Sequence, residues 1–267
     1  MLQFQVDPER CTQCDACVND CPRGILRRTE GTPEAVAADC LECQHCLAVC
    51  PAGAISVFGL NPIDSLPLGP IPSRRQMKTF IRGRRSVRRF LDEDIPAALI
   101  DELLADLAHA PSGCNARDLT FSVVSGRKSM AALLEKLIQA IETKPGEIQA
   151  DFVTEAVEAY RKNGTDPIFE GAPHLLVVSH GEKAVCFRED VVLALAYFEL
   201  LAQSAGLGTT WCGMVKFIAD MVPEVSGWFG LAPDTYFYAM IFGRPAVRYE
   251  RTVQRDQAAR IRRLDFA

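Results

Sequence analysis

Two short runs of cysteine near the start of the chain have the spacing of metal ligands. Each run reads C-x2-C-x2-C-x3-C-P, and the second follows the first at an offset of 29 residues. Their members are Cys11, Cys14, Cys17 and Cys21, and then Cys40, Cys43, Cys46 and Cys50. Gly24 and Gly53 match at the same offset. A duplicated run of this kind is the ligand pattern of a protein that carries two [4Fe–4S] clusters.

The spacing within each run has a physical reason. Three thiolates placed two residues apart can surround one face of a cubane cluster while nearby backbone N–H groups point toward its sulfurs. The fourth cysteine, which precedes proline, leaves that loop and ligates the other cluster. We therefore predict two ligand sets. The first is Cys11, Cys14, Cys17 and Cys50, and the second is Cys40, Cys43, Cys46 and Cys21.

Two other uses of clustered cysteines fit the pattern less well. Structural zinc sites usually present two C-x2-C pairs separated by a longer insert. Disulfides need an oxidising compartment, of which the sequence gives no sign. His45 lies inside the second run and corresponds to Ala16 in the first. Because four cysteines complete each site, we interpret His45 as a solvated neighbour and not as a ligand.

Composition and charge restrict the class of protein. Hydrophobic residues make up 48% of the chain and charged residues 24%, values typical of a soluble globular protein. A net charge of −5 argues against a general nucleic-acid binder. The first residues do not resemble a secretory signal. The longest apolar run, 191–202, is too short to span a bilayer and contains Glu199. We therefore expect a cytoplasmic protein with neither a nucleic-acid nor a membrane partner.

The position of the cysteines divides the chain into two domains. Only Cys114, Cys186 and Cys212 follow the second run, and proline and glycine are dense in the segment after it. Such a composition favours a linker or an extended arm. We predict a cluster-binding domain at 1–58, a linker at 59–78 and a larger domain at 79–267. A cluster domain only moves electrons, so the larger domain must contain the bond-changing chemistry.

The larger domain alternates helical and extended patterns, which predicts an α+β fold. Apolar residues at helical spacing and buried runs indicate helices at 96–109, 129–142, 147–162 and 190–205. Short apolar runs rich in β-branched and aromatic residues indicate strands at 119–125, 174–179 and 236–242. The helix at 190–205 is apolar nearly all round, so we expect it to be central. Neither a G-x-G-x-x-G turn after a strand nor a P-loop is present.

Two stretches early in this domain could bind a ligand. "GRRSVRRF" (83–90) combines arginines, which bind phosphate bidentately, with Ser86, whose hydroxyl can add a hydrogen bond. Taken alone, the run is equally well explained as a solvated basic face. "APSGCN" (110–115) allows the backbone to approach a ligand closely. Taken alone, it is simply a turn that ends a helix.

Two later stretches carry similar signals. "SAGLGTTWCG" (204–213) is a small-residue loop after the central helix, of the kind that can admit a planar ring against the backbone. Its alternative reading is a helix C-cap followed by a turn. "FGRPAVRYERTVQR" (242–255) ends a strand and carries several arginines. Alone, this charge run would face solvent.

The order and spacing of these four stretches resemble the nitroreductase family of FMN-dependent oxidoreductases over residues 79–267. That family has an arginine–serine motif near its start, a P-S-x-x-N turn about 25 residues later, a G-L-G loop after a long helix, and late arginines. With the cysteine runs in front, the chain resembles the ferredoxin-fused nitroreductases of anaerobic bacteria and archaea. The resemblance implies a small two-cluster ferredoxin-like domain followed by an α+β domain, in which helices flank a central mixed sheet.

The resemblance also implies which residues bind FMN. The phosphate and ribityl chain would be held by Arg84, Arg85, Ser86 and Arg88. The turn that contacts the flavin from the second subunit would be Pro111, Ser112, Gly113 and Asn115. Gly206, Leu207, Gly208 and Thr209 would lead to backbone amides at Cys212 and Gly213 that face the flavin. Arg255, and less surely Arg251, would be the late phosphate-binding arginines. The family often continues its turn as Asn-x-Gln-Pro-Trp, whereas this chain reads Asn115-Ala116-Arg117-Asp118, a departure that concerns the substrate side.

The resemblance predicts function only to the level of reaction type. We expect a homodimer in which FMN reduces a small conjugated or nitroaromatic acceptor. The electrons would reach FMN through the chain's own two [4Fe–4S] clusters, with an external ferredoxin or another electron donor as a possible source. One alternative is an electron-transfer module that relays electrons to a protein partner. Another is a related FMN activity such as reductive dehalogenation. The catalytic side chains are unknown, and His180 is the one histidine that merits a test as proton donor.

Overall fold

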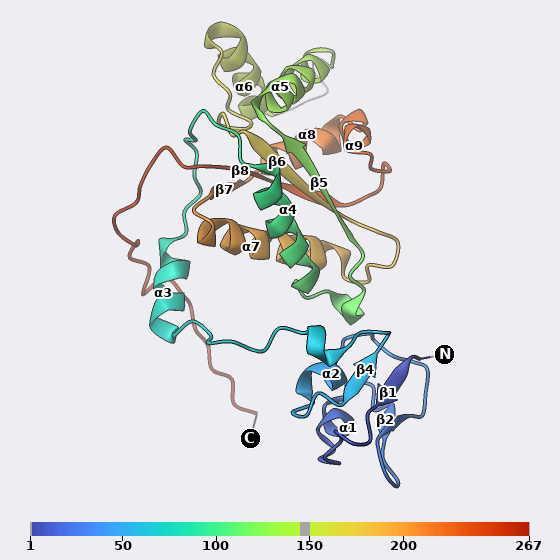
Figure 1. The fold of residues 1–267 in the computed structure, drawn as a ribbon. Helices are drawn as coiled ribbons and strands as arrows, with labels where there is room; N and C mark the ends of the chain where they lie inside the picture. The colour runs from blue at the N-terminus through green and yellow to red at the C-terminus, as the bar shows by residue number, and fades with distance from the viewer. Residues whose placement is uncertain (1, 145–149, 267) are drawn as a thin grey trace. The chain divides into compact units, whose positions relative to one another are not determined.

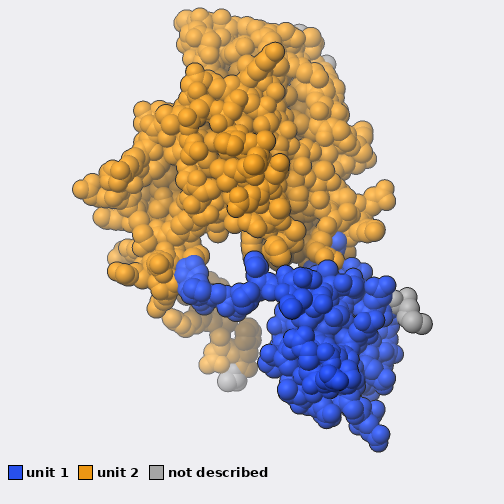
Figure 2. Space-filling model, viewed as in Figure 1, with its two compact units in different colours: residues 1–72, 114–116 blue, residues 73–113, 117–267 orange. Residues whose placement is uncertain are grey.

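The computed structural model describes residues 2–144 and 150–266. The chain divides into two compact units (Figure 2). The first contains residues 1–72 and 114–116, and the second contains 73–113 and 117–267. The predicted domain boundaries at 58 and 79 stay predictions. Among the described residues, no helix is both long enough and apolar enough to cross a membrane.

The first unit consists of short elements arranged as two similar halves. The elements are β1 (Phe4–Val6), α1 (Ala16–Asp20), β2 (Leu26–Arg27), β3 (Glu34–Ala35), α2 (His45–Val49), β4 (Ile55–Val57) and the 3-10 turn η1 (Pro62–Asp64). β1 pairs antiparallel with β4, and β2 pairs antiparallel with β3. The two helices start 29 residues apart, as the cysteine runs do. Cys17 and Ile25 are buried beside Leu26 and Ile55, so a cysteine forms part of this small core.

A four-stranded sheet forms the centre of the second unit. Its strands are β5 (Leu119–Ser125), β6 (His174–His180), β7 (Gly208–Trp211) and β8 (Phe237–Gly243), in the order β5-β6-β8-β7. Each pair of neighbouring strands is antiparallel. A parallel contact is added outside β7, where Ser86 bridges to Thr209. The segment that carries the early arginines is therefore attached directly to the edge of the sheet.

Helices cover both faces of this sheet (Figure 1). They are α4 (Ala97–Asp106), α5 (Arg127–Glu142), α6 (Asp151–Asn163), α7 (Phe187–Ser204), α8 (Gly213–Met221) and α9 (Glu224–Trp228). The helix α3 (Arg74–Gly83) has no buried residue and belongs to neither core cluster. Two 3-10 turns, η2 (Leu107–His109) and η3 (Gly113–Asn115), follow α4. Side chains alternate along a strand, so Leu176 and Met240 pack against α4 and α7 while Val177 and Ile241 pack against the other helices. The predicted α+β fold, with helices flanking a central sheet, is confirmed. The sheet was expected to be mixed, but its four named strands are all antiparallel, and the parallel part is the Ser86–Thr209 bridge.

Most predicted elements are present with shifted ends. The helix expected at 96–109 is α4 followed by the turn η2, and the central helix runs from Phe187 to Ser204. The helix expected at 147–162 is α6, which begins at Asp151, and residues 147–149 lie outside the described residues. The expected strands are β5, β6 and β8.

Three segments contain helices or strands that the sequence did not predict. The predicted linker contains the start of α3, where the Ser73 side chain accepts from the Gln76 N–H and Gln76 accepts from the Ser73 N–H. The pattern Ser73-x-x-Gln76 is a capping box, which could have predicted the start of this helix from the sequence. The small-residue loop contains the strand β7, whose residues do not alternate in polarity and whose hydrogen-bond partner is β8. The segment that follows it forms α8 and α9, and no prediction was made for this segment.

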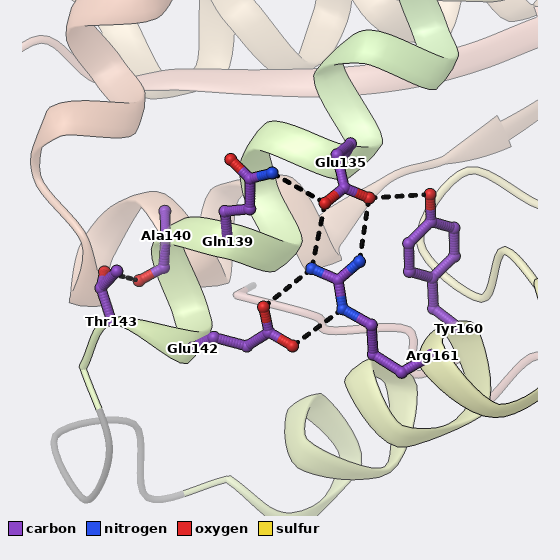
Figure 3. Close-up of polar contacts among 7 residues, drawn as sticks. All are labelled: Glu135, Gln139, Ala140, Glu142, Thr143, Tyr160 and Arg161. Carbon is purple, nitrogen blue, oxygen red and sulfur yellow. Dashed lines mark hydrogen bonds and ion pairs between the residues drawn. The ribbon is translucent and has the colours of Figure 1, made fainter.

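A network of ion pairs joins α5 to α6 (Figure 3). Arg161 of α6 donates to Glu142 at 2.9 and 2.8 Å and to Glu135 at 3.0 Å. Tyr160 donates its hydroxyl to Glu135 at 3.1 Å, and Gln139 donates to the same carboxylate at 2.8 Å. These hydrogen bonds hold the pKa of Glu135 and of Glu142 below the usual value. The network ties together α5 and α6, two of the helices that cover one side of the sheet.

Candidate cofactor sites

Each predicted set of four cysteines lines one cavity of the first unit. One cavity is lined by Cys11, Cys14, Cys17 and Cys50, together with Ala54 and other neighbours. The other is lined by Cys21, Cys40, Cys43 and Cys46, together with His45 and other neighbours. The fourth cysteine of each run therefore lies beside the three thiols of the other run. Among the described residues, no three His, Cys, Asp or Glu side chains converge as a single-ion site requires.

The backbone around these cavities explains the repeated spacing. Gln13 and Asp15 have positive φ angles of 55° and 59°, and Glu42 and Gln44 have 52° and 59° at the equivalent positions. This left-handed conformation curls the chain tightly between the cysteines. It also turns N–H groups toward sulfur. The Glu42 N–H donates to Cys40 Sγ at 3.3 Å.

Burial in this unit keeps some thiols protonated in the absence of metal. It raises the pKa of Cys46 to about 11 and raises that of Cys17. A hydrogen bond from the Ala16 backbone lowers the pKa of the exposed Cys14. Cationic iron would supply the charge that makes the buried sulfurs thiolates. The eight sulfurs therefore fit iron–sulfur clusters in their number, chemistry and placement around two cavities.

A larger cavity in the second unit joins three of the four stretches that the sequence singled out. Its volume is about 510 Å³, within the range of small-molecule sites. The early arginine segment contributes Arg84 and Arg85, the segment after α7 contributes Gly206 to Thr209, and the strand end contributes Pro245 to Tyr249. We call it the main cavity. The arginine segment is more than a hundred residues from the other two stretches in sequence, and the edge of the sheet brings all three together.

Hydrogen bonds hold the arginine segment against β7. The Val87 N–H donates to the Thr209 carbonyl at 2.9 Å, and the Thr210 hydroxyl donates to the Val87 carbonyl at 2.6 Å. Ser86 and Arg88 alternate with Val87 and do not line the main cavity. Arg88 lies 3.8 Å from the carboxylate of Glu170, whose pKa is raised by burial. The structure thus places two of the four predicted phosphate-binding residues in the cavity wall.

A second cavity lies on the other side of Arg84 and Arg85. We call it the arginine cavity. Its volume is about 400 Å³, and its wall consists of Ile81, Arg82, Arg84, Arg85, Val253, Arg255 and Asp256. Arg255, a predicted phosphate ligand, therefore lies near the early arginines, whereas Arg251 lines neither cavity. Asp256 forms an ion pair with Arg82.

The charges around the two cavities are partly balanced. Glu199 of α7 accepts a hydrogen bond from Arg84 at 2.9 Å, and Arg82 is paired with Asp256. Arg85 and Arg255 have no carboxylate partner within the described part of the chain. The Arg85 Nε atom is buried and has no hydrogen-bond partner there. Arg85 Nη2 donates to the Arg82 carbonyl, which leaves the other N–H groups of Arg85, and the guanidinium of Arg255, available to an anion.

No residue of the predicted turn lines the main cavity or the arginine cavity. The Gly113 N–H donates to Asp190 at 2.8 Å, and the Ser112 hydroxyl accepts from the Arg117 N–H at 2.9 Å. Asn115 has a positive φ of 54°. Pro111 and its neighbours line neither cavity of the same protomer. The resemblance implied that this turn contacts the flavin of the partner subunit, and that role stays a prediction.

The two predicted amides after β7 differ from each other. The Cys212 N–H donates to the Ala239 carbonyl of β8 at 2.9 Å. Its role toward the flavin stays a prediction. Gly213 begins α8, and a Cβ at this position would lie 2.7 Å from the hydroxyl oxygen of Tyr238. Burial raises the pKa of that tyrosine. His180 contacts the Gly181 carbonyl through Nδ1 at 2.9 Å and lines neither cavity.

Sequence reasoning missed two polar residues of α7 near the cavities. Glu199 was noted only as a charge in an apolar run, and Gln203 lies one helical turn later. Gln203 lines the main cavity and donates to the Phe80 carbonyl at 2.8 Å, which ties α7 to α3. The signal was available, because polar residues four apart in an otherwise apolar helix share one face.

Comparisons with known proteins match both units. Residues 81–244 match the nitroreductase family, and residues 8–55 match a 4Fe-4S dicluster domain. An iodotyrosine deiodinase of Thermotoga neapolitana is 30% identical over 128 residues, which are 48% of this chain and 68% of the relative.

Solved structures share the fold of the second unit. A nitroreductase of Bacteroides fragilis with bound FMN aligns with a TM-score of 0.54 and 23% identity, covering 68% of this chain and 97% of its own. An iodotyrosine deiodinase bound to FMN and 3-iodo-L-tyrosine aligns with a TM-score of 0.50 and 22% identity, covering 71% of this chain and 100% of its own.

Proposed function

The chain belongs to the nitroreductase family and carries a 4Fe-4S dicluster domain, and from this premise we propose that it is an FMN-dependent oxidoreductase fed by two [4Fe–4S] clusters. The single observation that carries the proposal is the main cavity, in which Arg84 and Arg85 share a wall with Gly206 to Thr209. An anion-binding group and a small-residue segment are the two surfaces that a flavin phosphate and ring require.

The residues present fit FMN in charge and in space. The main cavity and the arginine cavity share Arg84 and Arg85, so one ligand with a flat part and an anionic end can occupy both. Arg85 and Arg255, which have no carboxylate partner in the described part of the chain, would hold the phosphate together with Arg84, whose hydrogen bond to Glu199 is made by Nη1. The segment Gly206 to Thr209 would face the chain and ring. Ser86, Arg88, Gly213 and the turn at Pro111 keep their proposed roles toward FMN.

The protein's own residues would bind and orient FMN and would hold the clusters that supply its electrons. When bound, FMN accepts electrons singly and can pass them on in pairs to an organic acceptor. The thiols Cys11, Cys14, Cys17 and Cys50 would hold one cluster, and Cys21, Cys40, Cys43 and Cys46 the other. The small-residue segment leaves one side of the cavity open to a flat acceptor. We propose a homodimer in which the partner's turn at Pro111 completes the site.

We propose nitroaromatic or conjugated acceptors as the first substrate class. Reductive dehalogenation is the second candidate, and it is favoured by the similarity to an iodotyrosine deiodinase. In a third reading, electrons pass on to a protein partner. The donor can be an external ferredoxin or another reductant.

One experiment separates these possibilities. The full chain, purified without oxygen, is analysed for iron and FMN and then assayed with dithionite, reduced ferredoxin or NAD(P)H as donor. A nitroaromatic and a halogenated phenol serve as acceptors. We expect stoichiometric FMN and turnover of a small acceptor. Protein that is folded and iron-loaded but releases no FMN on denaturation would refute the proposal, and FMN without turnover of either acceptor would favour the electron-transfer reading.

A further inference from the structure

Glu199 is a buried carboxylate in the middle of an apolar helix. Only 7% of the residue is exposed, and its neighbours on α7 include the fully buried Leu195, Phe198 and Ala202. A carboxylate at such a position is unfavourable unless it is paired, and an apolar side chain would pack there at lower cost. The packing of α7 therefore does not explain why this position is acidic.

The partner of Glu199 explains its charge. Oε1 of Glu199 accepts a hydrogen bond from Nη1 of Arg84 at 2.9 Å. The Arg84 side chain is 29% exposed and lines both the main cavity and the arginine cavity. A free arginine side chain has many rotamers, and fixing it costs entropy. The carboxylate anchored in α7 selects one of them in advance of any ligand.

We propose that Glu199 is a positioning residue, which holds the Arg84 guanidinium between the two cavities so that it can bind the phosphate of a flavin mononucleotide. The inference rests on the proposed function. It adds a second residue of the central helix, one turn before Gln203, to the surroundings of the main cavity. Because Arg84 loses its side-chain entropy when the protein folds and not when the ligand binds, its contact with phosphate contributes more to affinity.

The sign of the charge effect allows a sharp test. Replacing Glu199 by a neutral residue removes a negative charge near the phosphate, which by electrostatics alone would strengthen FMN binding. A positioning role predicts the opposite for a residue that cannot accept a hydrogen bond. A loss of phosphate-dependent affinity on removing the carboxylate can therefore arise only from the loss of the Arg84 position.

The experiment compares FMN with riboflavin, which lacks the phosphate, in titrations of the full-length apoflavin protein followed by flavin fluorescence. The ratio of the two affinities isolates the phosphate contact and cancels general effects on the ring site. We expect Glu199→Leu to lower this ratio about tenfold. Glu199→Gln keeps an acceptor for Arg84, so its affinity ratio should be close to that of the wild type. Glu135→Leu, which removes a carboxylate far from both cavities in the Arg161 network, should leave the ratio unchanged.

A double-mutant cycle with Arg84→Met completes the test. If Glu199 acts through Arg84, adding Glu199→Leu to Arg84→Met lowers the ratio no further. If Glu199→Leu does not fold, Glu199→Asp, whose carboxylate is withdrawn by one methylene, should lower the ratio in the same direction. A wild-type ratio in Glu199→Leu, or an equal fall in Glu199→Gln, overturns the inference. If the wild-type protein binds neither flavin, it is the proposed function that fails.

Discussion

Gly208 lies so close to Val87 that a Cβ at this glycine would be 2.6 Å from Cγ2 of the valine. No carbon atom can be accommodated at that distance. The contact joins the first residue of β7 to the buried centre of the arginine segment, whose N–H donates to the neighbouring Thr209 carbonyl at 2.9 Å. The absence of a side chain at Gly208 therefore sets the position of Arg84 and Arg85.

Gly208→Ala is expected to push the arginine segment away from β7. We expect a loss of about 1–3 kcal/mol in the free energy of unfolding, as for other overpacked sites, and weaker binding of FMN. Urea unfolding followed by tryptophan fluorescence measures the first effect, because both tryptophans lie in the second unit. Adding Val87→Ala should recover part of the loss. Gly227→Ala is the control, since nothing lies within 4 Å of that position in α9, and a stability loss there as large as at Gly208 would contradict the explanation.

The two unpaired arginines should contribute selectively to phosphate binding. Arg85→Ala and Arg255→Ala are each expected to weaken FMN binding about ten- to hundredfold, the range for a charged hydrogen bond, and to leave riboflavin binding unchanged. Both variants should also reduce the salt dependence of FMN affinity. Arg251→Ala serves as the matched control, because Arg251 lines neither cavity. An equal effect of all three substitutions would indicate a diffuse field instead of a defined contact.

The exchange of the fourth cysteine between the repeats can be tested by iron content. With two [4Fe–4S] clusters the protein should hold about eight irons. The double variant Cys14→Ser/Cys50→Ser should keep about four, because both cysteines line one cavity. Cys14→Ser/Cys21→Ser should lose nearly all, because Cys21 lines the other. Cys114→Ser is the control and should keep the full content. Four irons in Cys14→Ser/Cys21→Ser would mean that each repeat binds its own cluster.

His174 should make the second unit sensitive to mild acid. It is fully buried, and its Nε2 accepts a hydrogen bond from the Ile95 N–H at 2.8 Å. Burial lowers its pKa below the usual 6.5. The unfolded chain therefore binds the proton more readily than the folded chain, so stability is full above about pH 6.5 and falls as the pH drops through the lowered pKa. Tryptophan-monitored unfolding between pH 7.5 and 5 should show this loss, and His174→Gln should flatten the curve. An unchanged slope in that variant would assign the effect elsewhere.

The Arg161 network should act at lower pH. Arg161 depresses the pKa of Glu135 and Glu142, so its contribution to stability is present above their usual value of 4.5 and is lost as the pH falls through the lowered values. Arg161→Gln should lower the melting temperature at pH 7 and have little further effect near pH 3. High salt should reduce the difference at pH 7, because these side chains are partly exposed. A deficit that is equal at both pH values would show that packing, and not charge, is responsible.

The local sequence determined the cluster residues and the family. The spacing of Cys11 to Cys50 predicted both sets of thiols that line the two cavities, because cysteine runs of this kind wrap their ligand locally. The four motifs of the larger domain identified the nitroreductase family, which the family comparison confirms. Long periodic segments such as α7 were also readable, since helical burial repeats every few residues. The cofactor roles of individual residues in that domain stay predictions.

Tertiary structure decided the rest. β7 was not predicted because its pairing partner β8 lies 26 or more residues later in the chain, and a strand without polarity alternation has no local signature. The pairing of Glu199 with Arg84 joins residues 115 positions apart. The Cys212 N–H, which the family motif assigns to the flavin, donates to the Ala239 carbonyl in this structure. The sequence by itself specified which residue types and local turns are present. Which of them share a cavity, and which are already engaged by the protein itself, depends on contacts between distant segments that form only when the sheet is assembled.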